Sequence, residues 1–495
     1  MAAADIAHPT VRDEPLGRDK TRLVWLLLAA AFVAILNETT MGLAISHLID
    51  DLSITAVSAQ WLTTAFMLTM AVVIPITGFL LRRFTTRQVF ITAMSLFSLG
   101  TFIAVLAPGF PVLVAARVVQ ASGTAIMMPL LMTTLMTIVP PHSRGRMMGR
   151  VSIVMSLAPA IGPSLSGFLL DTLGWRWIFG IVLPIALVAL GMGIRWMVNL
   201  GETTHAPIDV LSVVLSAFGF GGIVYGLSQI GGAVDHGGSG AAEGSTLTLS
   251  ISLVVGLVAL VLFLWRQVRL QRDDDALLDL RVFRSRNFSV AIVHMTVLSA
   301  AFFGIITVLP LYMQRALGME PGATGLAMLP GALLMGLAGP VIGRIYDARG
   351  TRVLMVPGSV IAVGTLWLYT TFTDTTPVWL VVVAQVLLSL GLAMSFTPLF
   401  TASLGSLPPR MYSYGSAVLS TVQQVAGAAG VAALITVMSS ASANSLALGV
   451  DPSAAEAAGA HAAFVVAAFL ALPLLVVAFL IRKPADAPQD PVPAR

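Results

Sequence analysis

The sequence contains no cysteine and few charged residues. Among its 495 residues, 10% are Asp, Glu, Lys or Arg, and 57% are hydrophobic. The lack of cysteine excludes a disulfide framework and a thiolate metal site, and we expect no bound metal. Average soluble domains carry roughly 25% charged residues. A soluble protein of this composition would therefore have too little polar surface to cover its core.

Signatures of enzymes and of nucleotide binding are also absent. The sequence has no Walker A loop, no HExxH pattern, no heptad zipper and no dinucleotide-binding strand pattern. We therefore expect neither an enzyme nor ATP hydrolysis, and no cofactor. The polar residues 1–20 lack the pattern of a signal peptide, so the first apolar segment should remain in the chain as a helix.

Long uncharged runs, such as residues 23–36, 118–138 and 353–372, are what the sequence has in abundance. Spanning a bilayer takes ~20 mostly apolar residues as a helix, whereas the strands of a membrane barrel alternate over ~10-residue segments. The runs are continuous, so we predict an all-α polytopic membrane protein. Its fourteen spans are expected at 23–46, 58–80, 88–107, 111–138, 148–170, 177–198, 208–230, 247–265, 287–313, 321–343, 353–372, 377–398, 413–438 and 460–481.

The basic residues assign an orientation to these spans. Of the 27 Lys and Arg, Arg117 falls inside a span, and only Arg176 and Arg315 fall in loops on one side. The rest lie on the other side, which the positive-inside rule makes cytoplasmic. We therefore predict a cell-membrane protein with both termini in the cytoplasm. Because the bases are dispersed over short loops, the pI of 9.7 does not indicate nucleic-acid binding.

The chain looks duplicated. Residues 78–87 read GFLLRRFTTR and residues 343–352 read GRIYDARGTR, each at a predicted cytoplasmic helix end. Parallel halves around a central site are a known transporter plan. We predict a cytoplasmic tail at 1–22, a six-helix bundle at 23–200, two linking membrane helices with their loops at 201–286, a second six-helix bundle at 287–482, and a cytoplasmic tail at 483–495.

Four motifs resemble those of a known family. The loop at 78–87 resembles GxLaDrxGrk, with Arg82 where Asp is usual. LVAARVVQASG at 113–123 resembles a helix-4 motif, APAIGPSLSG at 158–167 a helix-5 antiporter motif, and LNETTMGLA at 36–44 a helix-1 motif. Together they resemble the major facilitator superfamily, and within it the fourteen-helix drug:proton antiporters of the EmrB/QacA type. The resemblance implies the major facilitator fold and antiport of drugs against protons.

Two ionisable residues stand out as candidates for proton coupling. Of the 23 acidic residues, only Glu38 falls well inside a span, and Arg117 is the one base there. Intramembrane ionisable residues are functional candidates by default. Arg117 must find acceptors, which could be Glu38, backbone carbonyls of the first helix, or Gln120. Alternatively, Glu38 only packs helices, and Arg117 only anchors the fourth helix to the first.

Polar residues in the spans are candidates for substrate binding. Asn37 stands at the family's Asp position, but it points about 100° away from Glu38 on a helix, so the two cannot face a cavity equally. His294 could carry a proton, but a lone His in a helix is more often a hydrogen-bonded core residue. The full set of candidates is Asn37, Glu38, Trp61, Gln120, His294 and Gln385.

Two further groups are candidates for conformational roles. The resemblance assigns antiport to a bend in the fifth helix, formed by Pro159, Gly162, Pro163 and Gly167; an ordinary kink is the alternative. It also implies that the repeated loops close the cytoplasmic side as gates, whereas they could instead be topology signals only. Asp347 could pair with an arginine or cap the helix that follows it. The gate residues are Gly78, Arg82, Arg83, Arg87, Gly343, Arg344, Asp347, Gly350 and Arg352.

The predicted function is proton-coupled efflux of small amphipathic or cationic compounds by alternating access. The partners are a small-molecule substrate, protons and the lipid bilayer, with no nucleic acid. The sequence does not decide whether a periplasmic adaptor is needed. One alternative is a dedicated exporter of a single metabolite or antibiotic. Another is a sensor or assembly partner that transports nothing.

Overall fold

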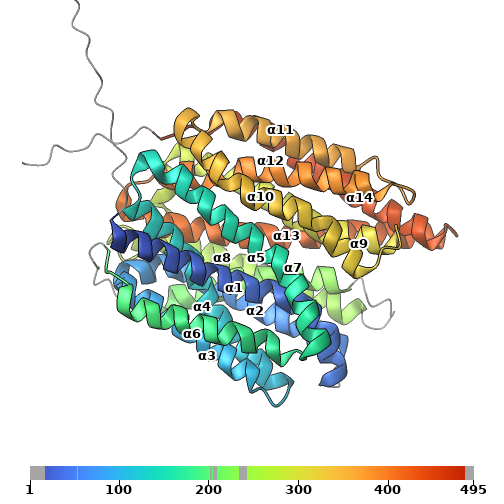
Figure 1. Cartoon of the computed structure of the whole chain (residues 1–495), viewed down its shortest axis with the longest axis horizontal. Coiled ribbons are helices and arrows are strands. Elements are labelled where there is room, and N and C mark those ends of the chain that lie inside the picture. The colour runs from blue at the N-terminus through green and yellow to red at the C-terminus, as the bar shows by residue number, and fades with distance from the viewer. Residues whose placement is uncertain (1–16, 53, 201–202, 204–208, 234–241, 485–495) are drawn as a thin grey trace, which may run out of the picture.

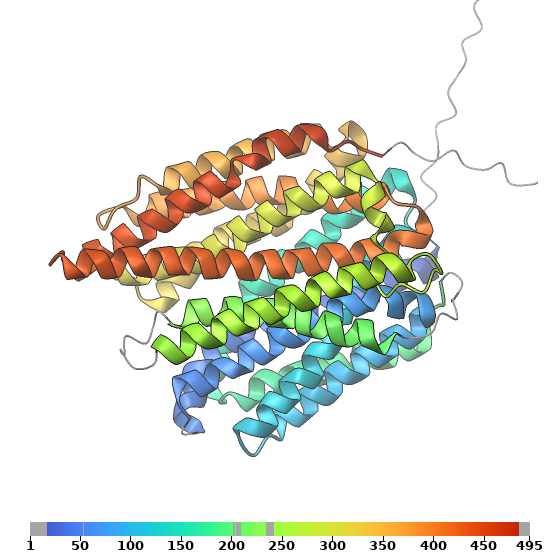
Figure 2. The ribbon, with the colours of Figure 1, turned by 180° about the vertical axis from the view of Figure 1, so that it is seen from behind.

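A computed structural model describes residues 17–52, 54–200, 203, 209–233 and 242–484. All regular secondary structure in these ranges is helical (Figures 1 and 2). The long helices are α1 Arg18–Asp51, α2 Ala56–Arg83, α3 Thr86–Val105, α4 Phe110–Ile138, α5 Arg144–Thr172, α6 Arg176–Trp196, α7 Val210–Ala233, α8 Ala242–Leu270, α9 Arg286–Arg315, α10 Pro321–Arg349, α11 Arg352–Tyr369, α12 Val378–Gly405, α13 Tyr412–Ala447, and α14 Pro452–Ala471 with α15 Pro473–Leu480.

Within the described residues, thirteen helices are long and apolar enough to cross a membrane. The remaining predicted span corresponds to α5, which is 29 residues long but has arginines at positions 144, 146 and 150 and is rich in Ser, Gly and Pro. With α5 included, each of the fourteen predicted spans coincides with a helix. The last of these is broken before Pro473, between α14 and α15.

Several helices are longer than predicted. α1 begins at Arg18 and reaches Asp51, beyond both ends of the predicted 23–46. α7 ends at Ala233 and α8 begins at Ala242, so both extend into the segment between the predicted spans 208–230 and 247–265. Hydrophobicity marks only the part of a helix that lies in lipid, whereas the polar ends continue because each turn satisfies its own backbone hydrogen bonds.

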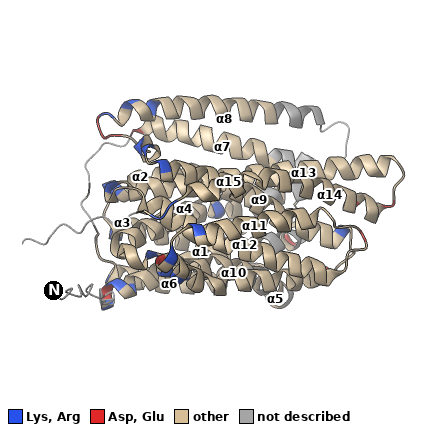
Figure 3. Cartoon of the chain, turned by 90° about the horizontal axis from the view of Figure 1, so that it is seen from above, with Lys and Arg blue, Asp and Glu red and all other residues tan. Residues whose placement is uncertain are grey.

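The helices pack as two groups with a pair beside them. α3 and α4, α1 and α5, and α2 and α4 pack together in the first group. In the second, α9 packs on α13, α11 on α12, and α10 on α12. α7 and α8 pack mainly on each other and lie along one side of the bundle, where α7 contacts α2 and α13 (Figure 3). The linking pair therefore touches both groups.

Among the described helices, α5 and α10 share the most extensive contact, and it joins the two groups. Glycines allow it: a Cβ added to Gly343 would lie 2.1 Å from the Gly145 carbonyl oxygen, and one added to Gly149 would lie 2.2 Å from that of Gly339. Small residues let helix backbones approach this closely.

Most Lys and Arg residues gather at one end of the bundle, which we call the basic end (Figure 3). The two repeated loops lie there, each joining the end of one helix to the start of the next. Between α2 and α3, Thr85 and Gln88 form a capping box. Between α10 and α11, Gly350 takes a φ of 82°, which favours glycine.

Candidate functional site

A buried network of polar side chains joins α1, α3 and α4. Arg117 of α4 is only 1% exposed, and its Nη1 donates hydrogen bonds to Asn37 Oδ1 of α1 at 3.0 Å and to Gln120 Oε1 at 2.7 Å. Gln120 Nε2 in turn donates to Thr101 Oγ1 of α3 at 2.7 Å. The network fixes the rotation of α1 relative to α4, with Asn37 facing the guanidinium.

The surroundings of the Arg117 guanidinium are otherwise apolar. It lies over the Phe66 ring, 4.1 Å from the ring centre, which is an attractive cation–π geometry. Its Nε and Asn37 Nδ2 are buried and have no hydrogen-bond partner in the described part of the chain. Arginine stays protonated in proteins. The full positive charge of Arg117 is therefore stabilised here by two amide oxygens and one aromatic ring.

Glu38 makes neither a salt bridge within 4.0 Å nor a hydrogen bond to any residue that the structure describes. Successive helix residues point about 100° apart. The Asn37 side of α1 faces α4, and the Thr39 side faces α5, where Thr39 Oγ1 lies 3.5 Å from the Ala158 carbonyl. Glu38 points between these directions and is half-buried. It interacts electrostatically with Arg117 but forms no salt bridge with it.

The predicted antiporter motif lies in α5, against α1. A Cβ at Gly162 would lie 2.3 Å from Thr39 Oγ1, and Ser166 Oγ donates to the Thr40 carbonyl at 2.8 Å. Pro159 is half-buried, and a Cβ at Gly167 would contact nothing within 4 Å. The side chain of Pro163 lies outside the described part of the structure. α5 therefore supports α1 next to Glu38.

Asp347, near the end of α10, binds the start of α5. Its carboxylate accepts hydrogen bonds from the backbone amides of Gly145 at 2.7 Å and Arg146 at 2.8 Å. We expected Asp347 to pair with an arginine or to cap the next helix. The glycine contact between α5 and α10 instead brings it to amides that have no partner in their own helix. Lys483 Nζ donates to the Asp347 backbone carbonyl at 2.9 Å.

Arg82, which stands where the family's Asp is usual, contacts α13. Its Nη1 donates to Tyr414 Oη at 3.0 Å, and its guanidinium lies over the same ring. Tyr414 Oη then donates to the carbonyl of Ala276 at 3.1 Å, in the segment that follows α8. The first repeated loop, the second helix group and the linking segment thus meet at one tyrosine.

Neither Tyr414 nor Tyr412 was among the residues predicted from the sequence. Tyr412 Oη accepts a hydrogen bond from Arg144 Nη2 at 3.2 Å, across the contact between the groups. The signal that points to them is the YSYG segment at 412–415, at the predicted start of a span, because tyrosine is enriched at membrane interfaces.

The other predicted gate residues have different surroundings. Gly78 packs on the Tyr414 ring, which would lie 3.0 Å from an added Cβ. Arg83 lies beside Phe84, 6.0 Å from its ring centre, and Arg87 Nη2 donates to the Ile194 carbonyl of α6 at 2.7 Å, within its own helix group. Arg344 and Arg352 are exposed.

The remaining substrate candidates do not join the network of Arg117. Gln385 Oε1 accepts a hydrogen bond from Tyr369 Oη at 3.1 Å, within the second group. His294 is fully buried in α9, and both ring nitrogens lack a partner in the described part of the chain. Trp61 is 41% exposed, with its ring 5.8 Å from that of Tyr225 of α7. Of the six candidates, Asn37, Glu38 and Gln120 lie around Arg117.

These features define a polytopic membrane protein with a charged network inside its helices, and comparisons with known proteins identify the class. The family model of the Major Facilitator Superfamily matches residues 27–210 and 208–431. The chain belongs to the Major Facilitator Superfamily, whose members are membrane transporters. The sequence-based predictions of this superfamily, of its fold and of a transporter rather than an enzyme are therefore confirmed.

Relatives and a solved structure agree with this assignment. The chain is 42% identical to the MFS-type transporter YcnB of Bacillus subtilis, over 99% of this chain and 100% of YcnB. It is 38% identical to the lincomycin resistance protein LmrB of Listeria monocytogenes, over 96% of this chain and 100% of LmrB. The human organic anion transporter MFSD10 (TETRAN) has a similar fold, with a TM-score of 0.62, 14% identity, and coverage of 93% of this chain and 99% of MFSD10.

Proposed function

We propose that this protein exports small amphipathic or cationic compounds from the cell in exchange for protons, as a fourteen-helix drug:proton antiporter. Its likeness to lincomycin resistance proteins along nearly the whole chain supports drug efflux. The proton gradient supplies the energy, without ATP or a cofactor.

One observation carries the proton-coupling part of the proposal. Glu38 is a half-buried carboxyl in the middle of a membrane helix, with no salt bridge to any described residue. An ionised acid at the bilayer centre costs at least ~2.5 kcal/mol. Such a group can take up a proton in apolar surroundings and release it when a cation or water reaches it. Arg117 is already held by Asn37 and Gln120, which leaves Glu38 available for this exchange.

Alternating access supplies the second part of the mechanism. By the positive-inside rule, we expect the basic end to face the cytoplasm. At that end Asp347 holds α5, Arg82 holds α13, and Ser152 Oγ lies 2.7 Å from Thr397 Oγ1 across the two groups. These contacts support a state in which the basic end is closed, and we propose that this state releases substrate outward. Breaking these contacts would open a path from the basic end to the interior, where the compound binds near Glu38.

The decisive experiment measures drug efflux driven by an imposed pH difference. The protein is reconstituted in liposomes, with lincomycin and the amphipathic cation ethidium as separate probes. We expect uphill transport with the wild type and none with Glu38→Gln, while proton release on adding the probe to purified protein should also disappear. Glu320→Gln, which changes an acid at the start of α10, is the matched control and should transport normally.

The alternatives predict other outcomes. Transport of lincomycin but of no other compound in a broad panel would favour a dedicated exporter. Normal pH-driven export by Glu38→Gln would disprove the proton-coupling role of this residue. A wild type that neither transports nor confers resistance at normal expression would favour a sensor or assembly partner.

A further inference from the structure

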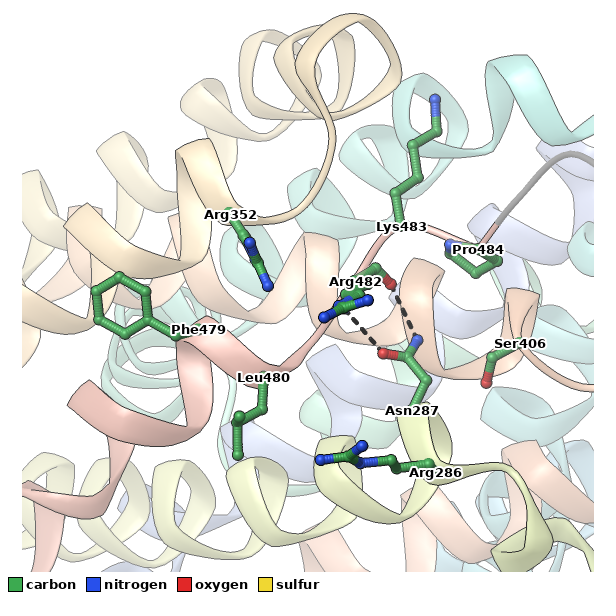
Figure 4. A pocket seen from close by; sticks show the side chains of 9 residues that line it. All are labelled: Arg286, Asn287, Arg352, Ser406, Phe479, Leu480, Arg482, Lys483 and Pro484. Atoms are coloured by element: carbon green, nitrogen blue, oxygen red, sulfur yellow. Dashed lines mark hydrogen bonds between the residues drawn. The ribbon is translucent and has the colours of Figure 1, made fainter.

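A pocket at the basic end, separate from the Arg117 network, collects cationic side chains. It has a volume of about 290 Å³ and lies between the first residues of α9 and α11, the end of α12, and the end of α15 with the segment after it (Figure 4). Its cations are Arg286, Arg352, Arg482 and Lys483, and none of the described residues that line it is acidic. The pocket thus concentrates positive charge in one place.

Three of these cations have no acidic partner among the described residues. Arg286, Arg352 and Arg482 are exposed, and none forms a salt bridge with a residue that the structure describes. Two of them stand at the first positions of α9 and α11, where the helix dipole also favours an anion. Lys483, in contrast, donates to the Asp347 carbonyl.

The chain holds this arrangement in place through Asn287. Asn287 Nδ2 donates to the carbonyls of Ala402 at 3.1 Å and Arg482 at 3.0 Å, and its Oδ1 accepts from the Arg482 amide at 2.9 Å (Figure 4). One side chain thereby fixes the segment after α15 against α9 and α12. The position of Arg482 is therefore set by hydrogen bonds of its backbone, while its guanidinium remains available.

One wall of the pocket is apolar and continues onto the outer surface of a membrane helix. Phe479 and Leu480 of α15 line the pocket and are 54% and 47% exposed. In a membrane-spanning helix such side chains face lipid tails. A ligand that matches both walls therefore carries a negative headgroup beside the arginines and an acyl chain along α15.

We propose that this pocket binds the phosphate headgroup of an anionic phospholipid, with an acyl chain of that lipid lying along Phe479 and Leu480. Guanidinium groups bind phosphate with charge-assisted hydrogen bonds, and basic pockets between membrane helices suit phospholipid headgroups. The proposal depends on membrane insertion and not on drug transport or proton coupling. In this proposal Arg352, which we predicted to be a gate residue, binds the lipid phosphate instead.

The test measures lipid binding to the delipidated full-length protein in detergent by native mass spectrometry. The probes are dioleoylphosphatidylglycerol and the zwitterionic dioleoylphosphatidylcholine, which has the same acyl chains. We expect the triple variant Arg286→Gln/Arg352→Gln/Arg482→Gln to bind phosphatidylglycerol about a hundredfold more weakly, from the ~1 kcal/mol that each cation contributes near a membrane surface. Phosphatidylcholine should bind weakly to both proteins.

The matched control removes the same charge elsewhere at the basic end. Arg269, Arg272 and Arg284 are exposed and lie outside the pocket, and their triple change to Gln should leave phosphatidylglycerol binding intact. The single variant Arg482→Gln tests the proposal even if the triple variant misfolds, because the Arg482 side chain makes no hydrogen bond to a described residue. It should bind phosphatidylglycerol more weakly while its unfolding temperature without lipid is unchanged.

Three results would overturn the proposal. The first is unchanged phosphatidylglycerol binding by the triple or the single pocket variant. The second is equal binding of phosphatidylcholine by the wild type. The third is competition by inorganic phosphate or glycerol phosphate as effective as that by phosphatidylglycerol, which would identify a site for a soluble phosphate compound.

Discussion

Arg117 of α4 donates a hydrogen bond to Asn37 of α1 across 3.0 Å, although the next residue, Glu38, carries the carboxylate. Arg117 thus has an uncharged partner, and the acid remains outside the network. This arrangement separates two roles that a single Asp at position 37 would combine. Asn37 holds the guanidinium, and Glu38 is left to exchange protons in the mechanism that we propose.

The first prediction tests this separation. Replacing Asn37 with Ala removes one of two hydrogen-bonding side chains from a buried guanidinium, which should cost about 1–3 kcal/mol of stability. The double variant Asn37→Asp/Glu38→Gln should not recover proton-driven efflux, because a carboxylate at position 37 would stay paired with Arg117. Thermal unfolding in detergent and liposome efflux measure the two effects. Efflux restored in the double variant would contradict the separation.

The second prediction concerns the hold of Asp347 on α5. Asp347→Asn removes a negative charge from the amides of Gly145 and Arg146, so the closed basic end should lose stability relative to the open state. Because the chain has no native cysteine, Thr133→Cys/Ser416→Cys, whose hydroxyls lie 2.8 Å apart, can report closure by cross-linking. The cross-link should form less in Asp347→Asn and normally in Asp374→Asn, which changes an exposed acid in the turn before α12.

The third prediction concerns the contact between Arg82 and Tyr414. Tyr414→Phe keeps the ring but removes the hydroxyl that binds Arg82 and the Ala276 carbonyl. A double-mutant cycle with Arg82→Ala should give a coupling free energy of about 1 kcal/mol. Tyr412→Phe should show no coupling with Arg82→Ala, because Tyr412 binds Arg144 instead. Equal coupling to both tyrosines would show that the measured effect is not this contact.

The fourth prediction concerns the glycines between α5 and α10. A Cβ at Gly149 would meet the Gly339 backbone at 2.2 Å, so Gly149→Ala should force the helices apart and cost about 1–3 kcal/mol. In the control Gly322→Ala, at the start of α10, nothing lies within 4 Å of the added carbon, so the unfolding temperature should not change. Unfolding temperatures and the Cys cross-link measure the difference. An unaffected Gly149→Ala protein would mean that the two helices are not packed this closely.

The fifth prediction is a pH dependence of stability from the pair that joins α7 and α8. Arg266 Nε and Nη2 donate to Asp209 at 2.6 and 2.9 Å, and together with Ser212 they lower the pKa of Asp209 to about 2. Because the unfolded value is about 3.9, this stabilisation is complete above about pH 4 and is lost as the pH falls towards 2. The loss should be up to about 2 kcal/mol.

Unfolding of the detergent-solubilised protein between pH 6 and pH 2.5 tests this expectation. Asp209→Asn should remove part of the acid sensitivity and lower stability at pH 6. If both proteins lose stability equally on acidification, other carboxyl groups account for the loss.

Composition along the chain was enough to predict the membrane class, the number and approximate positions of the helices, and the two residues most expensive to place in lipid. Those features depend on local composition, because a bilayer selects continuous apolar helices and makes charges inside them rare. The repeats at 78–87 and 343–352 were also found from local patterns, and each covers the end of one helix, a short connection and the start of the next helix.

Which distant residues contact one another depends on how the helices pack. No local pattern indicates that Arg117 binds Asn37 rather than Glu38, since the choice depends on the rotation of α1 against α4. Likewise, Asp347 reaches Gly145 across about two hundred residues because glycines bring α5 and α10 into contact. The pocket of Arg286, Arg352 and Arg482 forms only where three distant segments converge, and pairings of this kind depend on helix packing rather than on sequence proximity.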